Sequence, residues 1–382
     1  MLSERMQYIN ESATVSASNN VEKLKKQGVK IFNFGIGEPD FTTPENIIDY
    51  AFEMAKQGKT HYTPSAGIME LREKIAAKLR SKNGIEAEAD EVLVTPTKFG
   101  INLAMMVLIN PGDEVIIPDP YYVSYPDIVK LAGGKPVPVN TTESYDIDTD
   151  RIRKFITPRT KAIILNNPNN PTGKVLPEKD VKDLVDLAIE NNLYIVSDEI
   201  YEDLIYEGKL YSPASMGQEA FEHTITLNGF SKGYAMTGWR IGYLVAQREI
   251  VEAANVIQQQ TITCVSSISQ YAALKALDDN VSPSMMRSEF KKRRDLTYEI
   301  LSESEDLEVY KPEGAFYVFP AYKKSMESEE LSNLLLSRGQ VVVTPGDAFG
   351  LGGRRHFRIS FATSEETIRE GLERLIRTIH EI

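Results

Sequence analysis

The sequence predicts an α/β protein whose large domain contains a mostly parallel sheet flanked by helices and is joined to a smaller α+β domain. In the middle of the chain, short apolar strand segments alternate with helical segments, whereas the C-terminal part combines charged helices with short strands. The 382 residues exceed the roughly 100–200 residues of one simple core. We expect a large domain over 45–283 and a small domain formed by 1–44 and 284–382.

The predicted large domain is built from strand–helix units, whose crossover connections place helices on both faces of the sheet. Pro and Gly end its first two helices, at Asn110-Pro111-Gly112 and at Gly133-Gly134. The predicted strands are Glu91–Thr95, Glu114–Pro118, Ala162–Leu165, Leu193–Ser197 and Thr224–Leu227. The predicted helices are Gly100–Ile109, Tyr125–Leu131 and Glu178–Glu190.

The small domain is predicted to begin with a long charged helix and to end with an amphipathic one. Its predicted helices are Ser284–Ser302, Ser328–Arg338 and Ser364–Ile379. Its predicted strands are Gly314–Phe319, Gln340–Val343 and His356–Phe361. The first 44 residues carry weak sheet signals, and we expect them to pack with this domain.

Composition excludes several classes of protein. The net charge of −12 argues against a general nucleic-acid binder, which needs a basic surface. No run of about 18 apolar residues predicts a membrane span, and the N-terminus lacks an apolar signal core. The single cysteine, Cys264, permits neither an intrachain disulfide nor a cysteine zinc site, and the four histidines are scattered. We expect a cytoplasmic protein without a metal.

Polar segments follow five of the predicted strands at the point where each strand ends. In an open parallel sheet, ligands bind beyond the carboxyl ends of the strands. The sequence therefore predicts one site formed by these loops. They are Thr95–Lys98, Asp119–Tyr122, Asn166–Gly173, Asp198–Tyr201 and Asn228–Lys232.

Two residues in these loops indicate aldehyde chemistry. Lys232 follows a strand and lies among apolar residues, which lowers the pKa of a lysine and favours a Schiff base with an aldehyde. Asp198 ends an apolar strand, where its carboxylate needs a partner such as a protonated pyridine nitrogen. The alternatives are a solvated loop lysine and a helix N-cap before a helical turn at Glu199–Leu204. Tyr201 lies on the same side of that turn, with aromatic packing as its alternative.

Three further residues have the chemistry to bind anions or ring oxygens. Arg240, between two glycine-containing segments, suits a phosphate, and a surface salt bridge is its alternative. Asn170 lies in the segment NNPNNPTG, which is either a rigid turn or the donor to a ring oxygen. Arg358 lies inside the apolar strand FRISFA, where it requires an anionic partner such as a substrate carboxylate.

The motifs NNPNNPTG, SDEIYEDLIY, FSKGYAMTGWRIGY and FRISFA resemble those of class I aminotransferases, which are pyridoxal-phosphate enzymes of fold type I. The resemblance extends from SATVSA and GIGEPDF near the start to FRIS near the end. It is strongest to the prokaryotic aspartate aminotransferase-like branch.

The resemblance implies how the cofactor, pyridoxal 5′-phosphate, is held. Lys232 would form the Schiff base and later move the substrate proton, and Asp198 would pair with the pyridine nitrogen. Asn170 and Tyr201 would contact the ring hydroxyl oxygen, and Tyr122 would stack on the ring.

The resemblance also implies the remaining contacts of the site. Arg240 would bind the phosphate, and Arg358, with the backbone of Gly37, the substrate α-carboxylate. Tyr62 would reach the phosphate of a neighbouring subunit, which implies a homodimer with shared active sites. Thr14 resembles a substrate-contacting residue of the aspartate-active branch, or else is a polar loop position.

Two positions depart from the pattern of the family. Many relatives carry a serine three residues before the lysine, where this chain has Gly229, and Ser231 is the candidate that compensates. The loop TPTKF is one residue shorter than usual, so Thr97 and the backbone of Lys98 are the candidates for the phosphate there.

The implied reaction is transamination between an L-amino acid, with aspartate as the best candidate, and a 2-oxo acid, with 2-oxoglutarate as the best candidate. Lys98 or a partner's arginine would receive the distal carboxylate. Alternatives are an aromatic or alanine aminotransferase and a carbon–sulfur β-lyase on the same scaffold. A non-catalytic regulator that senses the cofactor would need a DNA-binding extension, for which the chain has little room before GIGEPDF.

Overall fold

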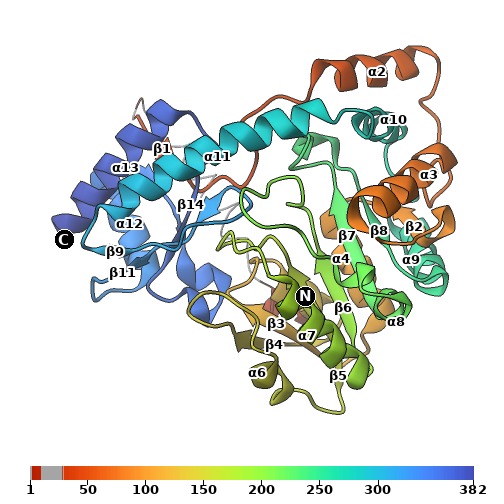
Figure 1. Ribbon diagram of the computed structural model, residues 1–382, viewed down its shortest axis with the longest axis horizontal. Helices are drawn as coiled ribbons and strands as arrows, with labels where there is room; N and C mark the ends of the chain where they lie inside the picture. Colours follow the sequence, from red (N-terminus) through yellow and green to blue (C-terminus); the bar gives the residue numbers. More distant parts are fainter. Residues whose placement is uncertain (1, 10–27, 29) are drawn as a thin grey trace.

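The structure is a computed structural model that describes residues 2–9, 28 and 30–382 (Figure 1). A seven-stranded sheet in the order β2-β8-β7-β6-β5-β3-β4 forms the centre of the large domain. Neighbouring strands from β4 to β7 are parallel, and β8 is antiparallel to both of its neighbours. The predicted mostly parallel sheet is therefore confirmed. Its strands are β2 (Val92–Val94), β3 (Glu114–Asp119), β4 (Lys135–Asn140), β5 (Thr160–Asn166), β6 (Tyr194–Asp198), β7 (Thr224–Gly229) and β8 (Gly242–Val245).

Both faces of the sheet are covered, because successive side chains of each strand point to opposite sides. Within β5, Ile164 packs into one apolar cluster and Ile163 into another. The first cluster contains side chains of α4 (Thr97–Leu108), α5 (Tyr125–Leu131) and α9 (Arg248–Thr261). The second contains side chains of α6 (Thr149–Arg153), α7 (Glu178–Glu190) and α8 (Gln218–Glu222). A third cluster lies among α2 (Glu45–Lys56), α3 (Met69–Lys78) and α10 (Ser267–Ala276).

The small domain combines short strands with three helices. β10 (Tyr317–Val318), β14 (Phe357–Ser360) and β13 (Thr344–Pro345) form an antiparallel sheet. β1 (Phe32–Asn33) pairs with β12 (Val341–Val342), and β9 (Leu307–Glu308) pairs with β11 (Ala321–Tyr322). The helices are α11 (Val281–Ser302), α12 (Ser328–Gly339) and α13 (Glu365–His380).

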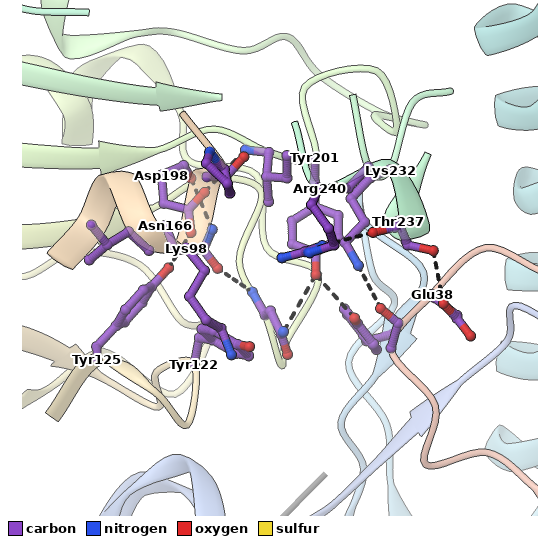
Figure 2. A pocket seen from close by; sticks show the side chains of 18 of the residues that line it. Glu38, Lys98, Tyr122, Tyr125, Asn166, Asp198, Tyr201, Lys232, Thr237 and Arg240 are labelled. Atoms are coloured by element: carbon purple, nitrogen blue, oxygen red, sulfur yellow. Dashed lines mark hydrogen bonds between the residues drawn. The ribbon is translucent and has the colours of Figure 1, made fainter. Parts of the chain in front are cut away.

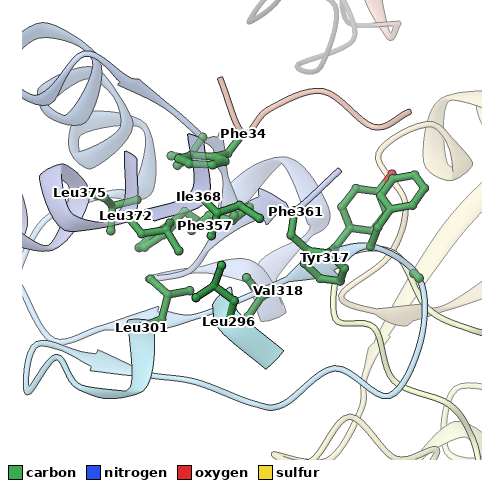
Figure 3. Close-up of a cluster of buried hydrophobic side chains, with 14 of the residues drawn as sticks. Phe34, Leu296, Leu301, Tyr317, Val318, Phe357, Phe361, Ile368, Leu372 and Leu375 are labelled. Carbon is green, nitrogen blue, oxygen red and sulfur yellow. The ribbon is translucent and has the colours of Figure 1, made fainter. Parts of the chain in front are cut away.

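The core of the small domain joins the N-terminal segment to the C-terminal helices (Figure 3). Phe34 packs in one cluster with Leu296 and Leu301 of α11 and with Ile368 and Leu372 of α13, all of them buried. The amphipathic pattern predicted for the last helix explains this packing, since its apolar side chains face one cluster. The domain boundaries at 44/45 and 283/284 stay a prediction. Helix α11 extends from the small domain, beside α13, toward α10 of the large domain (Figure 1).

The parallel strands bring their polar carboxyl ends to one edge of the sheet. Asn166 and Asp198 are directly paired neighbours at the ends of β5 and β6. The Asn166 amide donates to the Asp198 carbonyl at 2.9 Å, and its Oδ1 accepts from the Asn170 N–H at 2.7 Å. These bonds fix the loop after β5 against β6. Among the described residues, no helix has the length and apolar character to cross a membrane.

Candidate active site

A cavity of about 290 Å³ lies at this edge of the sheet, between the large and small domains (Figure 2). All of the predicted site residues except Tyr62 and Thr14 line it. The predicted residues at its wall are Gly37, Thr97, Lys98, Tyr122, Asn170, Asp198, Tyr201, Ser231, Lys232, Arg240 and Arg358. Tyr62 is 87% exposed and does not line the cavity, and Thr14 lies outside the described residues.

Lys232 reaches into the cavity with its amine bound to a neutral acceptor. Its Nζ donates to the Gly37 carbonyl at 2.6 Å and lies 5.4 Å from the centre of the Phe316 ring. Burial, together with the charge of Arg358, lowers the pKa of the Lys232 amine to about 8. At that pKa a useful fraction of the amine is neutral and nucleophilic near pH 7. The interpretation as a solvated loop lysine does not fit this environment.

Asp198 ends β6 and is only 6% exposed. Its Oδ2 accepts from the Tyr125 hydroxyl at 2.8 Å, and its Oδ1 accepts from the Ile200 N–H at 3.3 Å. Burial nevertheless raises the pKa of the carboxyl to about 6, although Tyr125, Ile200 and Lys232 all act to lower it. The helical turn predicted at Glu199–Leu204 is present as a hydrogen-bonded turn over residues 200–203 that does not continue into a helix. Asp198 therefore does not cap a helix.

Arg358 links the small domain to the loop after β5. Its Nη1 donates to Asn170 Oδ1 and its Nη2 donates to the Gly35 carbonyl, both at 3.0 Å. Both acceptors are neutral, and the buried Nε has no hydrogen-bond partner among the described residues. The guanidinium is 1% exposed, so an anionic ligand would satisfy both its charge and its free donor.

Tyr201 lies beside Asn170, as the sequence predicted for two residues that share one ligand atom. The Asn170 amide nitrogen is 3.5 Å from the Tyr201 hydroxyl, which is also 3.0 Å from the hydroxyl of Tyr317. Both tyrosines are buried, and burial raises the pKa of each phenol above its ordinary value. Both therefore stay protonated and can donate a hydrogen bond.

The cationic mouth of the cavity is formed by Arg240 and Lys98. Arg240 adopts a left-handed backbone conformation with φ of 55° and donates to the Thr237 carbonyl at 2.8 Å. Its partner is a carbonyl, so the alternative of a surface salt bridge is not what the structure shows. Lys98 lies in the first turn of α4, and its amine is 5.3 Å from the centre of the Tyr122 ring.

The absence of a serine at Gly229 has a steric cause. A Cβ atom at Gly229 would lie 2.6 Å from Thr97 Oγ1 and 2.8 Å from the Gly242 Cα. Both distances are closer than a Cβ contact allows. The Thr97 hydroxyl, which donates to the Asn228 carbonyl at 3.0 Å, thus occupies the space that a serine side chain would need.

Sequence reasoning missed two tyrosines of the site. Tyr125 donates to Asp198, and Tyr317 contacts Tyr201 and Arg358. The segments around them, a short helix and an apolar strand, predicted packing alone. The sequence did offer a signal for each: Tyr125 begins the helix after the Asp119–Tyr122 loop, and Tyr317 lies in a strand of the small domain.

The cavity fits pyridoxal phosphate. It carries cations at its mouth for a phosphate, and a buried carboxylate, Asp198, that accepts from neutral donors and lies ready for a protonated ring nitrogen. Lys232, with its lowered pKa, is suited to an aldehyde. Within the described residues no group of three or more His, Cys, Asp or Glu side chains is arranged to hold a metal ion.

Comparison with known proteins agrees with this fit. The family model for aminotransferases of class I and II matches residues 29–375. An aromatic-amino-acid aminotransferase 2 of Thermococcus litoralis is 44% identical, over 100% of this chain and 98% of that protein. The aspartate/prephenate aminotransferase of Thermus thermophilus is 43% identical, over 99% of this chain and 98% of that protein.

The fold agrees as well. The structure of an aspartate aminotransferase from Thermus thermophilus with maleate has a TM-score of 0.95 and 42% identity, and the match covers 99% of both chains. The chain therefore belongs to the class I and II aminotransferases, in the aspartate/prephenate aminotransferase-like branch, and is an aminotransferase that depends on pyridoxal phosphate.

Proposed function

We propose that the enzyme transfers the amino group of an acidic L-amino acid, with aspartate as the best candidate, to a 2-oxo acid, with 2-oxoglutarate as the best candidate. The observation that carries this proposal is the set of cations at the cavity. Lys98, Lys232, Arg240 and Arg358 line it, and their nearest polar or aromatic partners are neutral. One phosphate and two substrate carboxylates would match three of these charges and leave Lys232 for chemistry.

The residues that would hold the cofactor come from the five polar loops and from the segment that contains Arg240. When bound, pyridoxal phosphate supplies a protonated ring that accepts the electrons of the substrate α-carbon. In our proposal Lys232 holds it covalently, and Asp198 keeps its ring nitrogen protonated. Asn170 and Tyr201 bind the ring oxygen. Tyr122 stacks on the ring, while the phosphate is bound by Arg240, Ser231, Thr97 and the Lys98 backbone.

In our proposal, residues of the same cavity also bind the carboxylates of the substrate and transfer its α-proton. Arg358, with its free Nε, binds the α-carboxylate, and the backbone of Gly37 helps to orient it. Lys232 Nζ, once released, is the base that takes the α-proton and returns it, because its lowered pKa leaves part of the amine neutral. Lys98 binds the distal carboxylate of an acidic donor.

Replacing the amine at position 232 tests the core of this proposal. We expect Lys232→Ala to lose the covalent cofactor linkage and to lower kcat by at least about 100-fold, the usual worth of a general base. Absorption spectra and a coupled assay with 2-oxoglutarate measure both effects. Lys209→Ala, which removes an exposed lysine, is the matched control. Full turnover by Lys232→Ala would refute the role.

Removing the hydroxyl of Tyr125 tests the role of Asp198. The pKa of Asp198, about 6, means that its carboxylate ionises above that pH, so cofactor affinity should fall as pH drops through 6. Tyr125→Phe removes a hydrogen bond to the ionised form and should move this fall to higher pH by about 0.5 to 1 unit. Titration of the apoprotein with the cofactor from about pH 5 to about pH 9 measures this shift.

The matched control for that titration is Tyr121→Phe, which changes a neighbouring phenol that does not line the cavity. If Tyr125→Phe and the unchanged protein give the same pH profile, Tyr125 does not support Asp198.

Substrate choice is tested with Lys98. Lys98→Gln should raise KM for aspartate by roughly 10-fold, the worth of a charged hydrogen bond, and leave KM for alanine or aromatic donors within about 2-fold. Lys130→Gln is the control, since Lys130 pairs with Asp127 outside the cavity. Equal losses for all donors would refute a distal-carboxylate site at Lys98.

The same donor screen decides between the alternatives. The name of the Thermococcus litoralis relative supports aromatic donors as the second candidate. Preference for an aromatic donor over aspartate would select it. Release of ammonia and pyruvate from cysteine-type substrates, without amino transfer, would select the β-lyase.

We also propose a homodimer in which Tyr62 reaches the phosphate site of the neighbouring subunit. Its 87% exposure in the single chain leaves the phenol free to do so. Sedimentation should give twice the mass of one chain, and Tyr62→Phe should weaken cofactor affinity without dissociating the dimer. Tyr50→Phe is the control on a nearby helix. A sedimenting single chain in the presence of cofactor would contradict the proposal.

A further inference from the structure

Tyr317 lines the cavity beside Gly37, Tyr201 and Arg358, and the proposed function assigns it no role. It belongs to β10 and is 1% exposed, at the edge of the small-domain core (Figure 3). Its hydroxyl is 3.0 Å from that of Tyr201. A Cβ atom on Gly37 would lie 2.8 Å from the same hydroxyl, so the absence of a side chain there lets the phenol reach the cavity.

The guanidinium of Arg358 lies over the ring of Tyr317. The Arg358 Cζ lies 4.3 Å from the centre of this ring, closer than its 5.1 Å to the centre of the Phe349 ring. A cation held over an aromatic face is oriented by that face. The backbones also support this contact, because Tyr317 in β10 pairs with Ser360, two residues along β14 from Arg358.

Either hydroxyl of the Tyr201–Tyr317 pair can be the donor in the hydrogen bond between them. Burial raises the pKa of both phenols, and the charge of Arg358 acts in the opposite direction on both. The donor in this pair decides whether the proton of Tyr201 points toward Tyr317 or into the cavity.

We propose that Tyr317 is a positioning residue that couples carboxylate binding at Arg358 to the hydroxyl proton of Tyr201. A carboxylate on Arg358 offsets the positive charge over the Tyr317 ring, which makes Tyr317 a weaker donor to Tyr201. The hydrogen bond that Tyr201 offers to its ligand changes in response. This inference rests on the proposed roles of Arg358 and Tyr201.

The test uses the cofactor-loaded enzyme and its visible absorption as a function of pH. Maleate, an unreactive dicarboxylate, is the probe for the Arg358 site. In the unchanged protein maleate should shift the pH midpoint of the absorption change, and Tyr317→Phe should lose at least about half of that shift, the share carried by one hydrogen bond. Tyr322→Phe is the matched control, since Tyr322 is equally buried but donates to the Met326 carbonyl.

A second variant separates the ring from the hydroxyl. Tyr317→Leu removes the face beneath Arg358 and should raise KM for the amino donor about 10-fold, while Tyr317→Phe should keep KM within about 2-fold. A maleate shift in Tyr317→Phe equal to that of the unchanged protein would overturn the coupling, as would the absence of any maleate shift in the unchanged protein. Failure of the proposed function looks different: there the unchanged protein would not transaminate acidic donors.

Discussion

The arrangement of the site depends on one buried carboxylate, that of Asp198 at the end of β6. Burial makes the charge of this carboxylate unfavourable. The Tyr125 hydroxyl, the Ile200 N–H and the more distant charge of Lys232 stabilise it, and it has no direct ion pair among the described residues. The Asp198 carboxylate thus has no cation bound to it, and a protonated ring nitrogen would supply one. The parallel sheet makes this possible, because it delivers Asp198 and the loop after β5 to the same edge.

The central sheet could be predicted in large part because its signals are local. The strands β3, β5, β6 and β7 are short apolar runs, and each is followed by a polar segment. β4 was missed because Pro136 and Pro138 interrupt its pattern, which an edge strand tolerates. β8 was missed because it follows the Arg240 segment directly and runs antiparallel to its neighbours, outside the strand–helix alternation.

The site could be predicted where a motif carried it and not where only tertiary packing does. The resemblance pointed to Lys232, Asp198 and Arg358, and all three line one cavity. Tyr125 and Tyr317 carry no motif, because their task arises from what lies beside them in space. The helical turn expected after Asp198 is an isolated hydrogen-bonded turn over residues 200–203, although Asp198 Oδ1 accepts from the Ile200 N–H as a capping side chain would.

The contact between Thr97 and Gly229 makes two distant positions interdependent. The hydroxyl of Thr97 fills the space that a side chain at 229 would occupy. A smaller residue at 97 would relieve only one of the close contacts, because the Gly242 Cα in the backbone of β8 would still lie 2.8 Å from a Cβ at 229. A side chain at 229 therefore needs a shift of β8 as well as a change at 97. Because β8 lies between β2 and β7, such a shift would disturb the pairing of both neighbours, so the sheet itself, and not one side chain, keeps position 229 a glycine.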